Sequence, residues 1–311
     1  MKFTLLSSAC GAALIAASSP AIASKDFSGV VQLDVGAGTT ETSYISSLIS
    51  DLDDPLLVNG KAKGLWPLSE EIHLQADIFA EHADNIVKDA ADESASTFGA
   101  ALHLLHPFEN RARLGVVGSL WSNDVLIGTE TSDDATYGLF AVEGQFFGTD
   151  WTITGQAGLF SQLQCGNSCG GTLDEGTYIN GKIRYFLHDN TSLSLATTQM
   201  WGSLNDQDGI FGGKSVTSNF SQWMLEGEHR FADSPFSGTF AVSHEHTSVD
   251  LFETSADTNT VWLGLRFYYD QPTLKAHERS GAALETPTFG NSVESVASLF
   301  YGDLGDLDLP D

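Results

Sequence analysis

The sequence predicts an all-β fold: a membrane-spanning, antiparallel, up-and-down β-barrel of about 12 strands, with about 10 or 14 as the alternatives. Three observations lead to this fold. Successive segments alternate apolar and polar residues, short and long connections alternate between them, and aromatic residues gather beside the short connections. A barrel strand presents one face to lipid and the other to the lumen, so its residues alternate with a period of two.

The chain begins with the features of a secretory signal. Lys2 is followed by an apolar run that ends near Ala17, and the small-x-small sequence Ala21-Ile22-Ala23 precedes Ser24. The apolar run is too short for a helix that crosses a bilayer core of about 30 Å. We therefore expect a signal peptide over residues 1–23, a barrel over 24–270 and an acidic periplasmic tail over 271–311.

Composition restricts the classes of partner. Removal of the signal takes away one of 14 basic residues and none of the 41 acidic ones, so the mature chain carries a formal charge of −28. Such a charge argues against binding nucleic acid. No later segment approaches the roughly 18 apolar residues of a membrane-spanning helix. The mature chain keeps Cys165 and Cys169, which we expect to form a small disulfide loop, with metal binding by two thiolates as the weaker alternative.

Twelve segments have the period-two pattern. In chain order, the first six assign these residues to lipid: Phe27, Val31, Leu33, Val35; Ala62, Gly64, Trp66; Ile72, Leu74, Ala76, Ile78; Phe98, Ala100, Leu102, Leu104; Leu114, Val116, Leu120; Phe140, Val142, Phe146. The last six assign Trp151, Ile153, Ala157, Leu159; Ile179, Ile183, Tyr185, Leu187; Leu193, Leu195, Trp201; Trp223, Leu225, Phe231; Phe236, Phe240, Val242; and Val261, Leu263, Leu265, Phe267, Tyr269. The second segment is weakly patterned. Each is long enough to cross a bilayer as a tilted strand of about 9–11 residues.

The connections between these segments alternate in length. Five are short, at 67–70, 106–110, 148–150, 188–191 and 232–235, and six are long, at about 41–57, 82–95, 122–135, 161–175, 202–216 and 247–257. Short turns at one end and long loops at the other are typical of membrane barrels with an even number of strands. This pattern predicts that both ends of the barrel chain lie on the short-turn side.

Aromatic residues near the short turns predict an interfacial girdle. They are Trp66, Phe108, Phe146, Phe147, Trp151, Tyr185, Phe186, Phe231, Phe236, Phe267, Tyr268 and Tyr269. A soluble β-sandwich also alternates and uses short turns. It does not account for the girdle together with the alternating loop lengths.

The last segment, Val261–Asp270, carries Gly264, Phe267 and Tyr269 in the order glycine-x-x-aromatic-x-aromatic. This resembles the terminal-strand insertion signal of bacterial outer-membrane β-barrels, and the whole pattern over residues 26–270 resembles small porin-like proteins. The resemblance implies the outer membrane of a Gram-negative bacterium, with both termini periplasmic. It also implies outer-membrane lipid, lipopolysaccharide, the barrel-assembly machinery and small solutes as partners, and passive diffusion of those solutes as the function.

The polar face of the segments predicts a charged lumen. The residues assigned to the pore are Asp34, Lys61, Lys63, Asp77, Arg111, Arg113, Glu143, Lys182, Arg184, Glu226, Glu228, Arg230 and Arg266. Charged rings can set the selectivity of a channel. The alternative is that these charges pair and fill a closed barrel, which would serve adhesion, recognition or envelope structure. Acidic long loops favour a cation-selective entrance that could loosely hold Ca²⁺ or Mg²⁺, and no cofactor is otherwise expected.

One group of residues suggests chemistry instead of transport. His246, Ser248 and Asn259 are similar to the His-x-Ser plus Asn arrangement of outer-membrane phospholipase, in which histidine activates serine and asparagine orients the ring. This resemblance implies a lipid acyl hydrolase as a second alternative. The residues that follow the serine, Val249 and Asp250, depart from that family's pattern.

The tail over residues 271–311 does not continue the alternation. It carries seven acidic residues and a short helical pattern over 292–301. We favour a disordered tail. The alternative is a plug, in which the tail's acids meet the basic residues near the short turns.

Overall fold

The computed structural model describes residues 27–43, 54–84, 94–109, 111–127, 130–131, 135–165, 173–204, 216–250, 254–269 and 272–286. In these ranges the strands are β1 (Ser28–Ser43), β2 (Leu56–Pro67), β3 (His73–Asp84), β4 (Ser94–Phe108), β5 (Ala112–Ile127), β6 (Glu130–Thr131), β7 (Ala135–Phe147), β8 (Trp151–Cys165), β9 (Leu173–His188), β10 (Thr191–Leu204), β11 (Val216–Arg230), β12 (Phe236–Val249) and β13 (Thr254–Tyr269). One helix, α2 (Leu274–Ser280), follows them.

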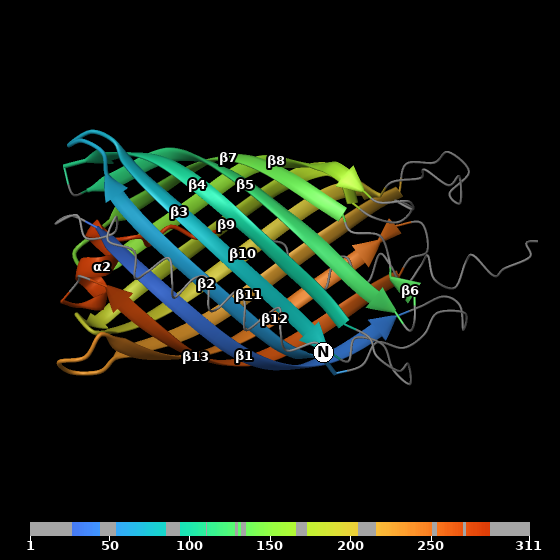
Figure 1. Cartoon of the computed structure of the whole chain (residues 1–311). Coiled ribbons are helices and arrows are strands. Elements are labelled where there is room, and N and C mark those ends of the chain that lie inside the picture. Colours follow the sequence, from blue (N-terminus) through green and yellow to red (C-terminus); the bar gives the residue numbers. More distant parts are fainter. Residues whose placement is uncertain are drawn as a thin grey trace, which may run out of the picture.

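The strands form a closed antiparallel barrel (Figure 1). Each main strand pairs with its neighbours in sequence, and β1 pairs with β13 from Gly29 opposite Tyr269 to Ser43 opposite Ser255. The two-residue β6 only extends the edge of β5, so the barrel wall contains 12 strands. The predicted fold class is confirmed, and the weakly patterned second segment pairs fully with β1 and β3.

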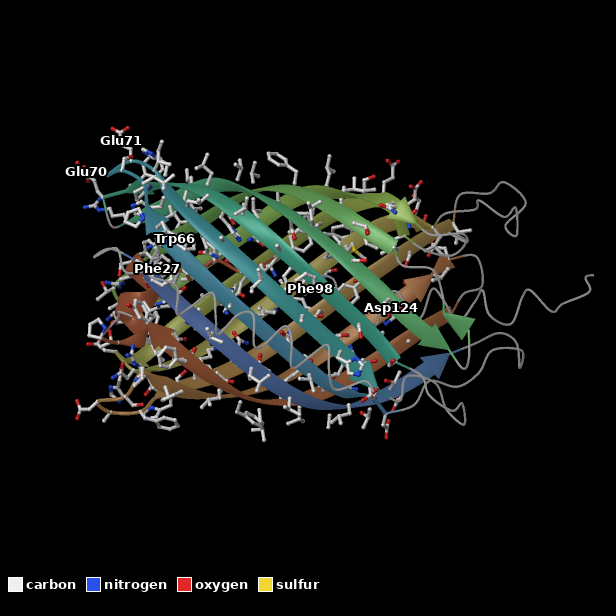
Figure 2. The ribbon with its side chains drawn as sticks, in the orientation of Figure 1. Phe27, Trp66, Glu70, Glu71, Phe98 and Asp124 are labelled. Atoms are coloured by element: carbon white, nitrogen blue, oxygen red, sulfur yellow. The ribbon has the colours of Figure 1, made fainter. Side chains whose placement is uncertain are left out.

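The strands are longer than the bilayer requires. They run for 12–16 residues and continue into stretches that the sequence assigned to long connections, as β1 does by reaching Ser43. At the opposite end the turns are short, and Glu109 and Asp233 adopt positive φ angles of 42° and 54° in two of them. Figure 2 shows Glu70 and Glu71 at the tip of one short turn and Asp124 toward the other end of the barrel.

The outer face of the wall is apolar, as the alternation predicted. Phe98, Phe140 and Leu263 are 57%, 62% and 65% exposed, and their neighbours along the strands point inward and are buried. Phe27, which was also assigned to lipid, is instead buried. It lies over Gly29 and Gly64, where an added Cβ would come within 2.9 and 2.8 Å of its ring, and Trp66 packs beside it at 5.1 Å between centroids. Small residues on the outer face thus leave a hollow that Phe27 covers.

Three aromatic residues assigned to the girdle point into the barrel instead. Phe147 stands opposite the buried Thr152, and the Arg113 guanidinium lies over its ring at 5.6 Å. Phe186 and Tyr268 are buried and pack with Val30 and Leu274. The reason is strand parity: their neighbours Tyr185, Phe267 and Tyr269 already occupy the outer face. Adjacent aromatic residues in a strand cannot both face lipid.

The lumen contains an apolar cluster toward the long-loop end. It is built from inward-facing wall residues of β3 to β13, including Phe79, Trp121, Tyr137, Phe160, Met200 and Phe220. These side chains are almost completely buried. Here side chains of the wall pack against one another inside the barrel.

The chain continues past β13 and enters the barrel at the short-turn end (Figure 1). Residues 272–286, here called the lumen segment, comprise α2 and an irregular stretch that packs against the inner wall. The sequence favoured a disordered tail, and these 15 residues are ordered because buried wall residues bind them. The short helix predicted over 292–301 lies outside the described residues, as does the signal over 1–23. No helix in the described residues is long and apolar enough to cross a membrane.

Candidate functional site

Helix α2 lies at the mouth of the barrel, beside the short turns (Figure 1). The Thr273 side chain caps the first turn by accepting a hydrogen bond from the Ala276 amide at 3.1 Å. Lys275 forms an ion pair with Asp150 at 2.8 Å, and its amide donates to the Asp189 carbonyl at 3.0 Å. Arg279 donates to the Gly148 carbonyl at 2.5 Å. These contacts attach the helix to two different turns.

The inner side of α2 is buried. Leu274 packs on Val30, Phe186 and Tyr268. The His277 ring lies edge-on to the Tyr268 ring at 4.6 Å, with Nδ1 3.4 Å from the Ser28 hydroxyl. Burial, reinforced by the nearby positive charges of Arg184, Arg113 and Lys63, lowers the pKa of His277 to about 3. This histidine is therefore neutral at pH 7.

The residues after α2 run along the inner wall and are held by their carbonyl groups. Arg113 donates to the Gly281 carbonyl at 2.9 Å, and Lys63 donates to the Leu284 carbonyl at 2.9 Å. Ala282 and Leu284 pack against the inward-facing Leu65 and Leu105. Main-chain polar groups that would be costly to bury thus find donors on the wall.

Two carboxylates of the lumen segment meet basic wall residues. Glu278 accepts hydrogen bonds from Arg184 at 2.9 Å and from Gln145 at 3.0 Å. Glu285 lies 2.6 Å from Lys182 and 3.4 Å from Lys63. Burial alone would raise the pKa of Glu285, but Lys182 and Lys63 outweigh it and hold that pKa well below its usual range.

A buried ion cluster belongs to the wall itself. Arg266 pairs with Glu226 at 2.5 Å and also with Glu228, and Arg184 lies 3.5 Å from Glu226. Tyr268 donates to Glu228 at 2.6 Å. Because these groups are nearly inaccessible to water, their charges depend on one another.

A second buried cluster centres on His103. Its ring nitrogens lie 3.2 Å from Asp77 and 2.9 Å from Glu143. Gln156 joins this cluster to the lumen segment, since it donates to Glu143 at 3.0 Å and to the Glu285 carbonyl at 2.8 Å. The Thr286 hydroxyl donates to Asp77 at 2.6 Å.

A cavity of ≈ 170 Å³ remains between the lumen segment and the wall. Its lining mixes both signs of charge and includes Asp34, Lys61, Lys63, Lys182, Arg184, Glu226, Arg266, Glu278 and Glu285. The space is large enough for a few water molecules. It lies on the side of β1, β2 and β9 to β13, away from most of the apolar cluster.

The structure places nearly all residues assigned to the pore on the inner face. Arg111 is the exception, because it lies in a short turn and is exposed. Arg230 is at the mouth, where it donates to the Ser234 carbonyl at 2.9 Å. Sequence reasoning missed His103 and the glutamines 75, 145 and 156, although their inward parity with Asp77, Glu143 and Thr154 could have identified them.

The insertion-signal residues occupy β13 as expected. Phe267 and Tyr269 face outward. Gly264 faces inward, where an added Cβ would lie 1.9 Å from the Asp34 carboxylate. A side chain at this position would collide with the wall's own polar groups, so the glycine has a packing role besides any role in insertion.

The proposed catalytic residues do not come together as the sequence suggested. His246 pairs with Asp257 at 2.8 Å, whereas Asn259 lies 3.0 Å from His244. The cause is register, since Asp257 stands opposite His246 on the neighbouring strand and Asn259 stands opposite His244. Asn259 therefore does not orient His246.

Two further expectations fall on residues that are not described. Cys169 lies outside the described ranges, and so does the side chain of Cys165, so the disulfide stays a prediction. Most acids of the long loops are also outside them. Within the described ranges, no group of three His, Cys, Asp or Glu side chains could hold a metal ion.

Comparison with known proteins identifies the fold and no family. The sequence matches no family model and no curated protein. Among solved structures, an outer membrane channel from Pseudomonas putida F1, described as COG4313, aligns with a TM-score of 0.56 and 14% identity over 81% of this chain and 98% of that one. The KdgM porin aligns with a TM-score of 0.40 and 8% identity, covering 77% and 99% of the two chains. The P. putida toluene transporter TodX aligns with a TM-score of 0.45 and 8% identity, over 82% of this chain and 93% of that one. The fold is thus that of outer-membrane β-barrels.

Proposed function

We propose that this chain is an outer-membrane channel of porin type, through which small solutes diffuse passively, and that its lumen segment closes the short-turn end. The observation that carries the proposal is how the lumen is filled. Its short-turn half has a charged wall and is occupied by a separate segment of chain, which could leave without breaking any strand pairing. The Pseudomonas channel supports the proposal through its fold alone.

The preference for cations belongs to the entrance in this proposal. On the inner face of the described wall, acidic and basic residues are close to balanced in number. The acidic residues are Asp34, Asp77, Glu81, Glu143, Glu226, Glu228 and Glu245, and the basic ones are Lys61, Lys63, Arg113, Lys182, Arg184, Arg230 and Arg266. The acidic excess lies in the sequence of the long connections. A negative rim concentrates cations near the mouth and repels anions.

The proposed location is the outer membrane of a Gram-negative bacterium, with the short turns and both termini in the periplasm. The apolar outer face supports contact with lipid, and the long connections on the other side would meet lipopolysaccharide. Insertion by the barrel-assembly machinery is proposed from the terminal-strand signal.

The test is conductance in planar bilayers. Deletion of residues 271–311 leaves every strand of the wall intact, because β13 ends at Tyr269. We expect this variant to conduct severalfold more than the full chain, with reversal potentials of the full chain that favour cations. Deletion of residues 292–311 alone is the matched control and should leave conductance unchanged, because it spares the lumen segment.

Other results would favour other functions. A deletion variant that does not conduct would indicate a barrel for adhesion, recognition or envelope structure. Anion preference of the full chain would contradict the proposed entrance. Phospholipid hydrolysis that disappears in Ser248→Ala would indicate the acyl hydrolase, although the His246–Asp257 pairing gives Asn259 no part in it.

A further inference from the structure

The wall that receives the lumen segment is a surface of hydrogen-bond donors. Seven side chains from six strands donate to oxygen atoms of the segment: Lys63, Gln75, Arg113, Gln145, Gln156, Lys182 and Arg184. The acceptors are the carboxylates of Glu278 and Glu285 and the main-chain carbonyls between Arg279 and Glu285. The segment is bound as an anionic, oxygen-rich ligand would be bound.

Two of these donors depend on the segment for their partners. Among the described residues, the hydrogen-bond and ion-pair partners of Lys63 are the Leu284 carbonyl and Glu285. Lys182 likewise has Glu285 as its hydrogen-bond and ion-pair partner among the described residues. Arg184 differs, because it also pairs with Glu226 and Glu228 of the wall.

Departure of the segment would therefore remove the direct ion-pair partners of two ammonium groups and leave them the longer-range charges of Asp77, near Lys63, and of Glu226, near Lys182. The Lys63 and Lys182 side chains are only 7% and 13% exposed even next to the cavity. The segment itself contributes to this burial, so its departure exposes both groups to water and costs their direct ion pairs. An anion that replaces Glu278 and Glu285 removes that cost.

We propose that Lys63, Lys182 and Arg184 form a binding site for solutes that carry two or more carboxylates, and that Glu278 and Glu285 occupy this site as an internal competitor. The inference rests on the proposed closure of the lumen by the segment. A polycarboxylate binds the undocked wall and not the docked one, so it shifts the equilibrium toward the open lumen. The acidic sequence of the long connections repels such solutes, so they enter from the short-turn end.

The experiment measures how often position 283 becomes accessible in the full-length chain. Ala283 is half-buried, lines the cavity and lies between the two buried residues Ala282 and Leu284, so a cysteine there reacts slowly while the segment is docked and faster when it leaves. The Ala283→Cys variant, refolded in detergent and checked by heat-modifiable gel migration, is labelled with a charged maleimide, and labelling at position 283 is quantified by peptide mass spectrometry. The probe is propane-1,2,3-tricarboxylate, compared with sodium chloride of equal ionic strength and with sucrose.

We expect the tricarboxylate to accelerate labelling by about fivefold or more, as for ordinary coupling between two ligands. Adding Lys63→Gln and Lys182→Gln should raise the basal labelling rate and reduce the response to less than about twofold. Lys61→Gln is the matched control, because Lys61 is on the same strand as Lys63 but pairs with Glu81 of the wall at 3.8 Å. It should keep the full response.

Two outcomes would overturn the inference. One is an unchanged labelling rate with the tricarboxylate in the parent variant. The other is an equal response after both lysines are replaced. If labelling does not respond while deletion of 271–311 still increases conductance, the carboxylate site fails and the channel stands. If labelling responds but no form of the protein conducts, the channel fails and the site stands.

Discussion

The two halves of the lumen are filled in different ways. Toward the long loops, large apolar side chains of the wall such as Trp121, Phe160 and Phe220 pack against one another inside the barrel. Toward the short turns the wall carries charged and amide side chains, and the space between them is occupied by residues 272–286. The first group of side chains belongs to the strands themselves. The second filling, the lumen segment, follows β13 and is held by hydrogen bonds, ion pairs and the packing of Leu274, Ala282 and Leu284, so this is the half that we propose a solute or a change of pH to open.

We expect the largest loss of stability from a substitution in the apolar cluster, which lies in the half toward the long loops. Trp121→Ala removes a side chain that is 2% exposed and stacks on Tyr137 with ring centroids 5.4 Å apart. We expect the free energy of unfolding to fall by about 4 kcal/mol, because the wall cannot collapse to fill the cavity. Urea titration in lipid vesicles measures it. Phe140→Ala, on the lipid face, is the control and should cost clearly less. Equal losses would mean that the apolar cluster is not a packed core.

The wall of the other half should be somewhat less sensitive. Arg266→Leu leaves Glu226 and Glu228 without their main partner, and we expect a loss of about 3 kcal/mol, the lower part of the range for a broken buried pair. Arg184 remains near both carboxylates and limits the loss.

Lys275→Met removes an ion pair with Asp150, whose side chain is 48% exposed, and should cost less than about 1 kcal/mol. A loss as large as that of Arg266→Leu would show that α2 stabilises the barrel itself.

The last effect concerns docking of the lumen segment and depends on pH. Docked His277 has a pKa of about 3, whereas an undocked histidine has its ordinary value of 6.5. Between these values the undocked segment binds more protons, so docking weakens as the pH falls below 6.5. Glu285 acts in the same direction at lower pH, because its pKa is depressed when it is docked.

Open probability in bilayers should therefore increase on acidification from pH 7 to pH 5, by at most about tenfold per pH unit for one proton. His277→Gln removes the titrating ring and should abolish most of the increase. The groups that face His277 are Ser28 and Tyr268 on the wall, with Arg184, Arg113 and Lys63 at longer range. An increase that persists unchanged in His277→Gln would assign the response to other carboxylates.

The alternation of residues was sufficient to predict the barrel and the direction of most side chains. Leu33, Phe140 and Leu263 face outward as expected, and Asp77, Glu143 and Arg266 face inward. The expected aromatic girdle, in contrast, was wrong at Tyr268, because it counted aromatic residues near the short turns without regard to the face of the strand. Alternation put His246 and Asn259 on the lipid face of neighbouring strands, but it could not show that Asn259 stands opposite His244. Register between strands decides which residues face each other, and the turn lengths alone left that register open.

What the sequence by itself determined is therefore local: strand positions, the two faces of each strand and the alternation of short turns with long connections. These follow from the period of a β-strand and from the cost of exposing polar groups to lipid. What only the tertiary structure decided is how the lumen is filled. Glu278 and Glu285 are far from Arg184, Lys182 and Lys63 in sequence, and their pairing exists because barrel closure brings six strands around one space. No periodicity encodes such contacts, so the ordering of residues 272–286 in that space could not be predicted from their composition.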